Sequence, residues 1–205
     1  MYPLTKPTGG LIIGKRLLNA PKVVHPDIPM PVRALFVTDL HARREGLSII
    51  DTVCDQIAAL EPRLLLLGGD YGEGQEPTMR FLRRLGKILP GVPKLAVTGN
   101  NDDYFFGEDL TALRGAMAEN GVTLLSNEMR RLTIDGQKME IAGVQDAYNG
   151  QPCAENLFSR EQGVYRILLS HAPHTFLLDQ AAPDIMLAGH THGGQFNVLG
   201  LTCYT

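Results

Sequence analysis

The sequence contains no tryptophan and only three cysteines in 205 residues. Cys54, Cys153 and Cys203 lie far apart, and no two of them form a CxxC pair. An odd and sparse set of this kind argues against a disulfide scaffold and is typical of a reducing compartment. Because Cys54 lies in an apolar stretch with helical periodicity, we expect it to be a small buried hydrophobic residue.

Long apolar runs and long basic runs are also missing. No segment approaches the ~20 apolar residues that cross a bilayer. The run 11–13 is shorter than the core of a signal peptide, which has about 7–15 residues. The formal net charge is -3, so binding to a nucleic-acid backbone has no electrostatic support. We therefore expect a soluble, cytoplasmic protein.

The remaining composition is that of an ordinary globular domain, with 44% hydrophobic and 20% charged residues. Residues 1–32 contain six prolines and predict an irregular N-terminal arm. Residues 33–205 are long enough to form one compact domain with its own core.

Short apolar runs alternate with segments of helical periodicity. Runs at 34–37, 64–67, 95–97, 166–169 and 184–188 predict buried strands, while the spacing within 49–60, 79–89 and 110–117 predicts helices. Three further short strands are expected at 122–125, 131–134 and 139–144, with Asp135-Gly136 as a hairpin turn between the last two. The pattern predicts an α/β sandwich whose sheet is covered on both faces and is partly antiparallel.

Each of the five main apolar runs ends in side chains that commonly bind metals. Taken singly, these side chains have simpler interpretations, such as helix caps, turns and hydrogen-bonded core histidines. In α/β sheets, however, ligands gather at the carboxyl ends of the strands, so five strands in one sheet would bring the set together. The joint pattern therefore predicts a metal site made of Asp39, His41, Asp70, Asn100, His171, His190 and His192.

Nitrogen and oxygen donors without thiolate favour two divalent metal ions drawn from manganese, iron and zinc. Seven ligands exceed a single tetrahedral site, but they suffice for two metals if one carboxylate bridges them. Paired metals of this kind act on phosphate esters in phosphatases and nucleases.

The ordered motifs Asp39-Leu40-His41, Gly69-Asp70, Gly99-Asn100-Asn101-Asp102, His171 and Gly189-His190-Thr191-His192 resemble those of the calcineurin-like metallophosphoesterases. The resemblance implies two mixed β-sheets flanked by helices. It also implies a phosphoester substrate, which is attacked by a hydroxide bridging the two metals.

By the same resemblance, Asp70 would bridge the two metals. Asp39, His41 and His192 would complete the first site, and Asn100, His171 and His190 the second. Gly69-Asp70-Tyr71 and the stretch 189–195 are most similar to a bacterial branch. This branch includes membrane-associated phosphodiesterases that act on cell-envelope lipids and UDP-diacylglucosamine, which implies a phosphodiester substrate and peripheral membrane contact.

Asn101 departs from the family, in which a histidine at this position helps to protonate the leaving group. Asparagine donates a hydrogen bond but does not titrate, so we assign Asn101 a catalytic role without a general acid. Two alternatives remain open: a cyclic-nucleotide phosphodiesterase, and a non-catalytic scaffold like the retromer subunit that has this fold and lacks the histidine. Asp102 and Asp103 are expected to cap the next helix rather than to orient Asn101.

The family pattern also continues for several strands after Gly189-His190-Thr191-His192, whereas ten residues follow Gln195 here. If C-terminal strands are missing, one sheet exposes an edge beside His192, which favours a homodimer. His174 fits a solvated residue at a helix start better than a residue that contacts the substrate. Arg43 and Arg44 fit a phosphate contact and an exposed surface pair equally well.

Overall fold

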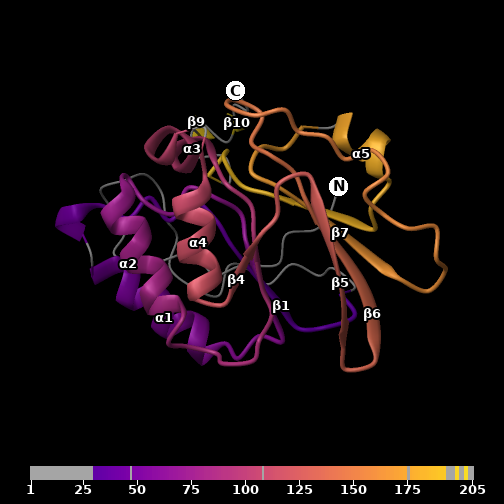
Figure 1. Cartoon of the computed structure of the whole chain (residues 1–205), viewed down its shortest axis with the longest axis horizontal. Helices are drawn as coiled ribbons and strands as arrows, with labels where there is room; N and C mark the ends of the chain where they lie inside the picture. The colour runs from indigo at the N-terminus through magenta and orange to yellow at the C-terminus, as the bar shows by residue number, and fades with distance from the viewer. Residues whose placement is uncertain are drawn as a thin grey trace.

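A computed structural model of the protein describes residues 30–192, except Leu47, Glu108 and Thr175, together with the backbone of two short C-terminal strands. Nearly all of the predicted N-terminal arm, Cys203 and the motif residues 193–195 lie outside the described residues. Two four-stranded sheets pack together, and helices cover the outer face of the first sheet (Figure 1).

The first sheet is parallel throughout, in the order β1-β2-β3-β4. Its strands are β1 (Ala34–Val37), β2 (Leu64–Leu67), β3 (Lys94–Ala96) and β4 (Val122–Leu124). The last residues of the first three strands lie side by side, because Val37 pairs with Leu67 and Leu67 with Ala96. The loops that follow these strands therefore begin at the same edge of the sheet.

The second sheet is mixed, in the order β5-β6-β7-β8. β5 (Glu128–Ile134) and β6 (Gln137–Gly143) form the predicted hairpin, with Asp135 and Gly136 at positive φ in the turn. β7 (Tyr165–Ser170) and β8 (Ile185–Ala188) continue parallel to β6. The predicted two-sheet α/β fold is confirmed, but the five strands that precede the predicted ligands belong to two sheets instead of one.

Four helices lie along the first sheet or at its upper edge: α1 (Ser48–Ala59), α2 (Gln75–Leu85), α3 (Asn100–Phe106) and α4 (Thr111–Glu119). A 3₁₀ turn (Arg44–Gly46) precedes α1, and α5 (Phe176–Ala181) lies beside the second sheet. α2 begins four residues before the predicted start and ends before Leu89. Gly86 caps this helix, and the φ angle of +50° at Leu89 is incompatible with further helical turns.

The four leucines of β2 are divided between two cores, because successive side chains of a strand point to opposite faces. Leu65 and Leu67 pack with the helices, where Cys54 is also buried as predicted. Leu64 and Leu66 pack between the sheets against Ile141, Ile167 and Leu169. This double burial explains why β2 is a continuous apolar run.

The described helices include none long and apolar enough to cross a membrane. β8 pairs with β7 alone among the described strands, and the short strands β9 (Asn197–Val198) and β10 (Leu201–Thr202) pair with each other. The homodimer expected from an exposed strand edge stays a prediction.

On β6, the side chain of Glu140 is fully buried and lies in a charged network. Its Oε1 accepts a hydrogen bond from Arg131 at 2.5 Å, its Oε2 accepts one from the Ser159 N–H at 2.9 Å, and Arg166 Nε lies 3.8 Å away. Burial opposes ionisation, but the bonds from Ser159 and Arg131 outweigh it and lower the pKa of Glu140.

We therefore expect Glu140→Gln to lower the free energy of unfolding by about 1–3 kcal/mol at neutral pH. A lowered carboxyl pKa stabilises the fold above the unfolded-state pKa of about 4.3, and this stabilisation is lost as the pH falls. The difference between wild type and Glu140→Gln should thus shrink below about pH 4. Urea unfolding at several pH values measures it, and an equal loss in the control Glu128→Gln, whose side chain is 38% exposed, would contradict this account.

Candidate metal centre

All seven predicted metal-binding side chains lie at the carboxyl ends of strands. Asp39 and His41 follow β1, Asp70 follows β2, and Asn100 begins α3 shortly after β3. From the second sheet, His171 follows β7, and His190 and His192 follow β8. The structure brings the whole set together at one rim where the two sheets meet.

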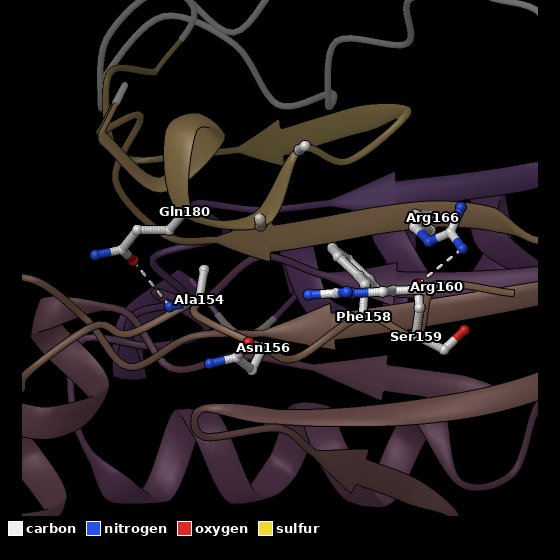
Figure 2. Close-up of a pocket in the computed structure, with 9 residues that line it drawn as sticks. Ala154, Asn156, Phe158, Ser159, Arg160, Arg166 and Gln180 are labelled. Carbon is white, nitrogen blue, oxygen red and sulfur yellow. Dashed lines mark hydrogen bonds between the residues drawn. The ribbon is translucent and has the colours of Figure 1, made fainter.

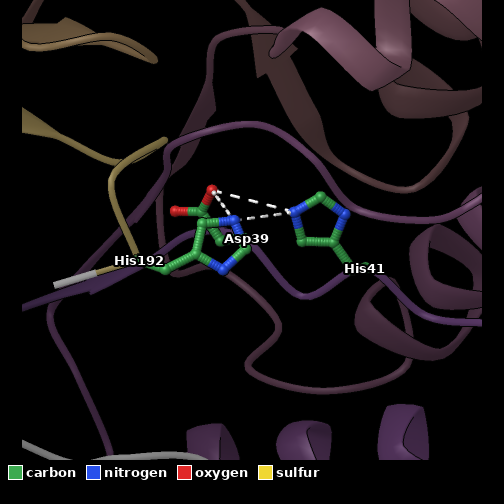
Figure 3. A group of neighbouring side chains, drawn as sticks. All are labelled: Asp39, His41 and His192. Carbon is green, nitrogen blue, oxygen red and sulfur yellow. Dashed lines mark hydrogen bonds and ion pairs between the residues drawn. The ribbon is translucent and has the colours of Figure 1, made fainter. Parts of the chain in front are cut away.

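The first group consists of Asp39, His41 and His192 (Figure 3). His41 Nε2 lies 3.2 Å from His192 Nε2, and the two rings are stacked with centroids 4.9 Å apart. Asp39 Oδ1 lies 3.5 Å from His192 Nε2 and 3.9 Å from His41 Nε2. Three donor atoms from two sheets thus face one small space.

The second group consists of Asp70, Asn100, His171 and His190. Asn100 Oδ1 lies 3.1 Å from His171 Nε2 and 3.0 Å from His190 Nδ1, while these two nitrogens are 3.2 Å apart. Asp70 Oδ2 lies 3.5 Å from His171 Nε2. His171 is fully buried, whereas His190 is only partly covered.

Asp70 connects the two groups, because its Oδ2 also lies 3.3 Å from His41 Nε2. Burial opposes its ionisation, yet His171, the Asn101 N–H and His41 outweigh this effect and lower the pKa of Asp70 to about 2. Asp70 in turn outweighs burial at His171 and raises the pKa of that imidazole. This central position supports the predicted bridging role.

Backbone geometry at the rim is unusual. The left-handed conformation, which is uncommon for residues other than glycine, occurs at five of the seven predicted ligands: Asp39, His41, Asp70, His190 and His192. Each such residue costs roughly 1–2 kcal/mol. Strain of this size persists where surrounding contacts enforce it, and it is concentrated at functional sites.

Two glycines let the rim loops approach one another. A Cβ on Gly99 would collide with Asp70 Oδ1, and one on Gly189 would collide with Thr38 Oγ1 and come within 2.6 Å of Asp39 Oδ2. The glycines of the Gly-Asn and Gly-His motifs are therefore required by close packing against the carboxylates.

Outer contacts orient three of the four histidines, and two of these partners, Glu73 and Tyr148, were not predicted from the sequence. Glu73 Oε1 lies 3.1 Å from His41 Nδ1, and the Tyr148 hydroxyl lies 3.0 Å from His190 Nε2. His171 Nδ1 donates to the Gly68 carbonyl at 2.8 Å. In each ring one nitrogen faces the group, and the other is held by the protein, as in many metal sites.

Two side chains of α3, those of Asn101 and Asp102, hold Asp70 and the backbone next to it in place. Asn101 Nδ2 donates to Asp70 Oδ2 at 2.7 Å, and its backbone N–H donates to Oδ1 at 2.9 Å. Asp102 is fully buried and accepts from the Gly99 N–H, which caps α3, a helix that the sequence pattern did not predict. It also accepts from the N–H groups of Asp70 and Tyr71, so it ties the end of β2 to the end of β3.

The remaining residues singled out from the sequence lie at the margin. Arg43 and Arg44 are exposed, with an Arg43 nitrogen 4.0 Å from Glu73. His174 precedes α5, but it is partly covered, and its Nε2 is buried without a hydrogen-bond partner among the described residues. The expectation of a solvated His174 is therefore wrong, because the ring packs near Phe176.

Two cavities adjoin the second sheet. One, of about 480 Å³, borders the second group at Asn100 and His190. The other, of about 330 Å³, lies between the loop at Ala154 and α5, where the Ala154 N–H donates to Gln180 Oε1 (Figure 2). Because no acidic residue or histidine lines this second cavity, it does not extend the candidate metal centre.

The donor set fits metal ions. Pairs of imidazole nitrogens 3.2 Å apart repel each other unless a cation or a proton lies between them. Ligand bonds of about 2.0–2.2 Å place neighbouring donor atoms roughly 3 Å apart around one ion. Burial is the main cause that lowers the pKa of His41 and of His190, which favours the neutral imidazole that binds metals.

Fold and site together define an α/β protein with a candidate metal centre, and comparisons with known proteins agree. The family model of calcineurin-like phosphoesterases matches residues 32–194. The chain is 31% identical over 176 residues to the phosphodiesterase YaeI of Escherichia coli, which covers 84% of this chain and 64% of that protein. It is also 31% identical over 170 residues to YpbG of Bacillus subtilis, an uncharacterised protein, covering 80% and 62% respectively.

Among solved structures, a 5'-nucleotidase precursor from Thermus thermophilus shares the fold with a TM-score of 0.50 and 14% identity. The match covers 78% of this chain and 42% of that one. The protein therefore belongs to the calcineurin-like phosphoesterase family, whose members depend on metal ions. The chain spans a little under two thirds of the length of the two relatives.

We expect Gly189→Ala to reduce metal binding strongly, because the added methyl group would displace the Asp39 carboxylate. Metal bound per chain, measured by mass spectrometry after dialysis, tests this. The matched control is Gly115→Ala on α4, where a Cβ meets no atom within 4 Å and should stabilise the helix by about 0.5–1 kcal/mol. Normal metal content in Gly189→Ala would contradict the close-packing argument.

Proposed function

We propose that the protein is a hydrolase that cleaves a phosphodiester with two divalent metal ions. The observation that carries the proposal is the position of Asp70, whose Oδ2 lies 3.3 Å from His41 in one group and 3.5 Å from His171 in the other. A carboxylate shared in this way is what a pair of metals requires.

Asp39, His41, Asp70 and His192 would hold the first ion, and Asp70, Asn100, His171 and His190 the second. Oxygen and nitrogen donors suit manganese, iron or zinc. Such ions polarise a phosphoryl group and lower the pKa of water toward neutrality. The protein contributes fixed ligands, because Glu73, Gly68 and Tyr148 hold the outer nitrogens of three histidines.

The cavity next to the second group would hold the substrate. It has a volume of about 480 Å³ and is lined by Asn100, Asn101, Tyr104, Tyr148, Asn149 and His190. It therefore offers amide and hydroxyl groups for polar oxygens, as well as two tyrosine rings for an organic substituent. A phosphodiester is favoured over a monoester because the similar E. coli protein is named a phosphodiesterase.

Asp70→Asn should remove most of the bound metal and abolish hydrolysis of bis-p-nitrophenyl phosphate, because the neutral amide is a poor bridge between two cations. Circular dichroism should show an intact fold. The control is Asp51→Asn on α1, a half-exposed residue that pairs with Arg80 and Arg84 and belongs to neither ligand group. Two metals per chain with normal turnover in Asp70→Asn would disprove the bridging role.

The same measurements separate an enzyme from a scaffold. Metal-dependent turnover by the wild type that is lost on chelation and restored by Mn²⁺ or Zn²⁺ supports the hydrolase. A protein that binds metal but hydrolyses neither aryl nor alkyl phosphodiesters would support the scaffold.

Asn101→His should raise turnover on alkyl phosphodiesters, whose leaving groups need protonation, with little gain on aryl ones. The increase can approach ~10²-fold, the lower end of general-acid catalysis, if the imidazole reaches the leaving oxygen. Rates on one aryl and one alkyl substrate across pH test this, with metal content as the control. Equal or lower activity on both substrates at full metal content would show that the site is built around the contact of Asn101 with Asp70.

A further inference from the structure

Tyr148 is largely exposed to solvent, yet its hydroxyl contacts one of the predicted metal ligands. Its side chain is 61% exposed, yet its hydroxyl lies 3.0 Å from Nε2 of His190, and the two ring centroids are 4.8 Å apart. Among the described residues, the hydroxyl has no other hydrogen-bond partner. Neither the motifs nor the spacing of the sequence pointed to Tyr148.

The direction of this hydrogen bond depends on what Nδ1 of His190 binds. Nδ1 of His190 faces Asn100 Oδ1 and His171 Nε2, at 3.0 and 3.2 Å. When Nδ1 acts as a ligand, the neutral ring carries its proton on Nε2. Nε2 then donates to the Tyr148 oxygen, which leaves the phenolic O–H available as a donor to another group.

The loop that carries Tyr148 is anchored rather than loose. Asp146 is fully buried, and its Oδ2 accepts the N–H groups of Tyr148 and Asn149 at 2.8 and 3.2 Å. Asn149 Nδ2 donates to the Asn100 carbonyl at 3.2 Å, which joins the loop to the start of α3. These contacts fix the tyrosine relative to Asn100 and His190 before any substrate arrives, and such preorganisation is what a positioning residue needs.

The hydroxyl also lies at a cavity that is open to substrate. Tyr148 lines the space of about 480 Å³ together with Asn101, Tyr104 and His190. Asn101 is occupied by Asp70, to which it donates at 2.7 Å. When Nδ1 of His190 acts as a ligand, the phenolic O–H of Tyr148 is a donor at this wall that no contact among the described residues uses.

We propose that Tyr148 is a positioning residue of the metal centre: its hydroxyl holds His190 with Nδ1 turned inward, and its O–H donates to a phosphoryl oxygen in the cavity. The first part rests on the geometry of His190. The second part rests on the proposed phosphodiesterase function.

The test is Tyr148→Phe, which removes the hydroxyl and keeps the ring. Mn²⁺ is titrated into the metal-free protein by calorimetry, so this readout does not depend on turnover. We expect the weaker of the two Mn²⁺ sites to lose about 10-fold in affinity, the lower end of the effect of removing an outer partner of a metal ligand. The matched control is Tyr104→Phe, which alters a 77% exposed tyrosine in the same cavity and should leave Mn²⁺ affinity unchanged.

Inorganic phosphate serves as the probe for the second part. Its inhibition constant for bis-p-nitrophenyl phosphate hydrolysis should rise roughly 10-fold in Tyr148→Phe at saturating Mn²⁺, as expected for losing a hydrogen bond to a charged group. Mn²⁺ affinity within twofold of wild type, or an equal loss in Tyr104→Phe, would overturn the positioning role. An unchanged phosphate constant would overturn the contact with substrate. A wild type without phosphodiesterase activity, but with weaker Mn²⁺ binding in Tyr148→Phe, would refute the proposed function and leave the positioning role standing.

Discussion

Close contact between the loops at the sheet rim is the constraint on which the candidate site depends. The carboxyl ends of β1, β2 and β3 are level, and the ends of β7 and β8 meet them from the second sheet. The His190 N–H donates to both oxygens of Asp39 at 3.1 and 3.0 Å, which is possible only because Gly189 has no side chain. Buried apolar side chains between the sheets, such as Leu66 and Leu169, hold the two halves at this separation.

Without bound metal ions, the backbone and side-chain arrangement at the rim reduces the stability of the folded state. Five predicted ligands have left-handed backbones, and the imidazole nitrogens that lie 3.2 Å apart need a proton or a cation between them. Two carboxylates, Asp39 and Asp70, point into the same space. Hydrogen bonds to Asp102 and the two packed cores must offset this strain, and a bound cation would relieve the electrostatic part. Folding stability and metal affinity are therefore expected to be linked, as mass action requires for any ligand that binds the folded state.

Much of this arrangement could be predicted from the sequence, because apolar runs followed by ligand-type residues are local patterns. The strands, the hairpin at Asp135-Gly136 and the grouping of seven side chains all follow from such patterns. The division of the strands between two sheets was implied by the family resemblance and not by the local patterns, because strand pairing depends on contacts distant in sequence. Glu73 and Tyr148 were missed for the same reason: they contact His41 and His190 across 32 and 42 residues, and neither lies in a recognisable motif.

The two halves of the site have different surroundings, and this difference suggests a division of labour. His41 in the first group is held by the carboxylate of Glu73, which strengthens an imidazole as a ligand. His190 in the second group is held by a neutral phenol at the edge of an open cavity. A ligand held by a carboxylate favours tight, permanent binding of an ion, whereas a ligand held by a hydroxyl beside solvent leaves room for a substrate oxygen. Under the proposed function, the second group would be where water is exchanged for a phosphoester, and the first would retain its metal ion.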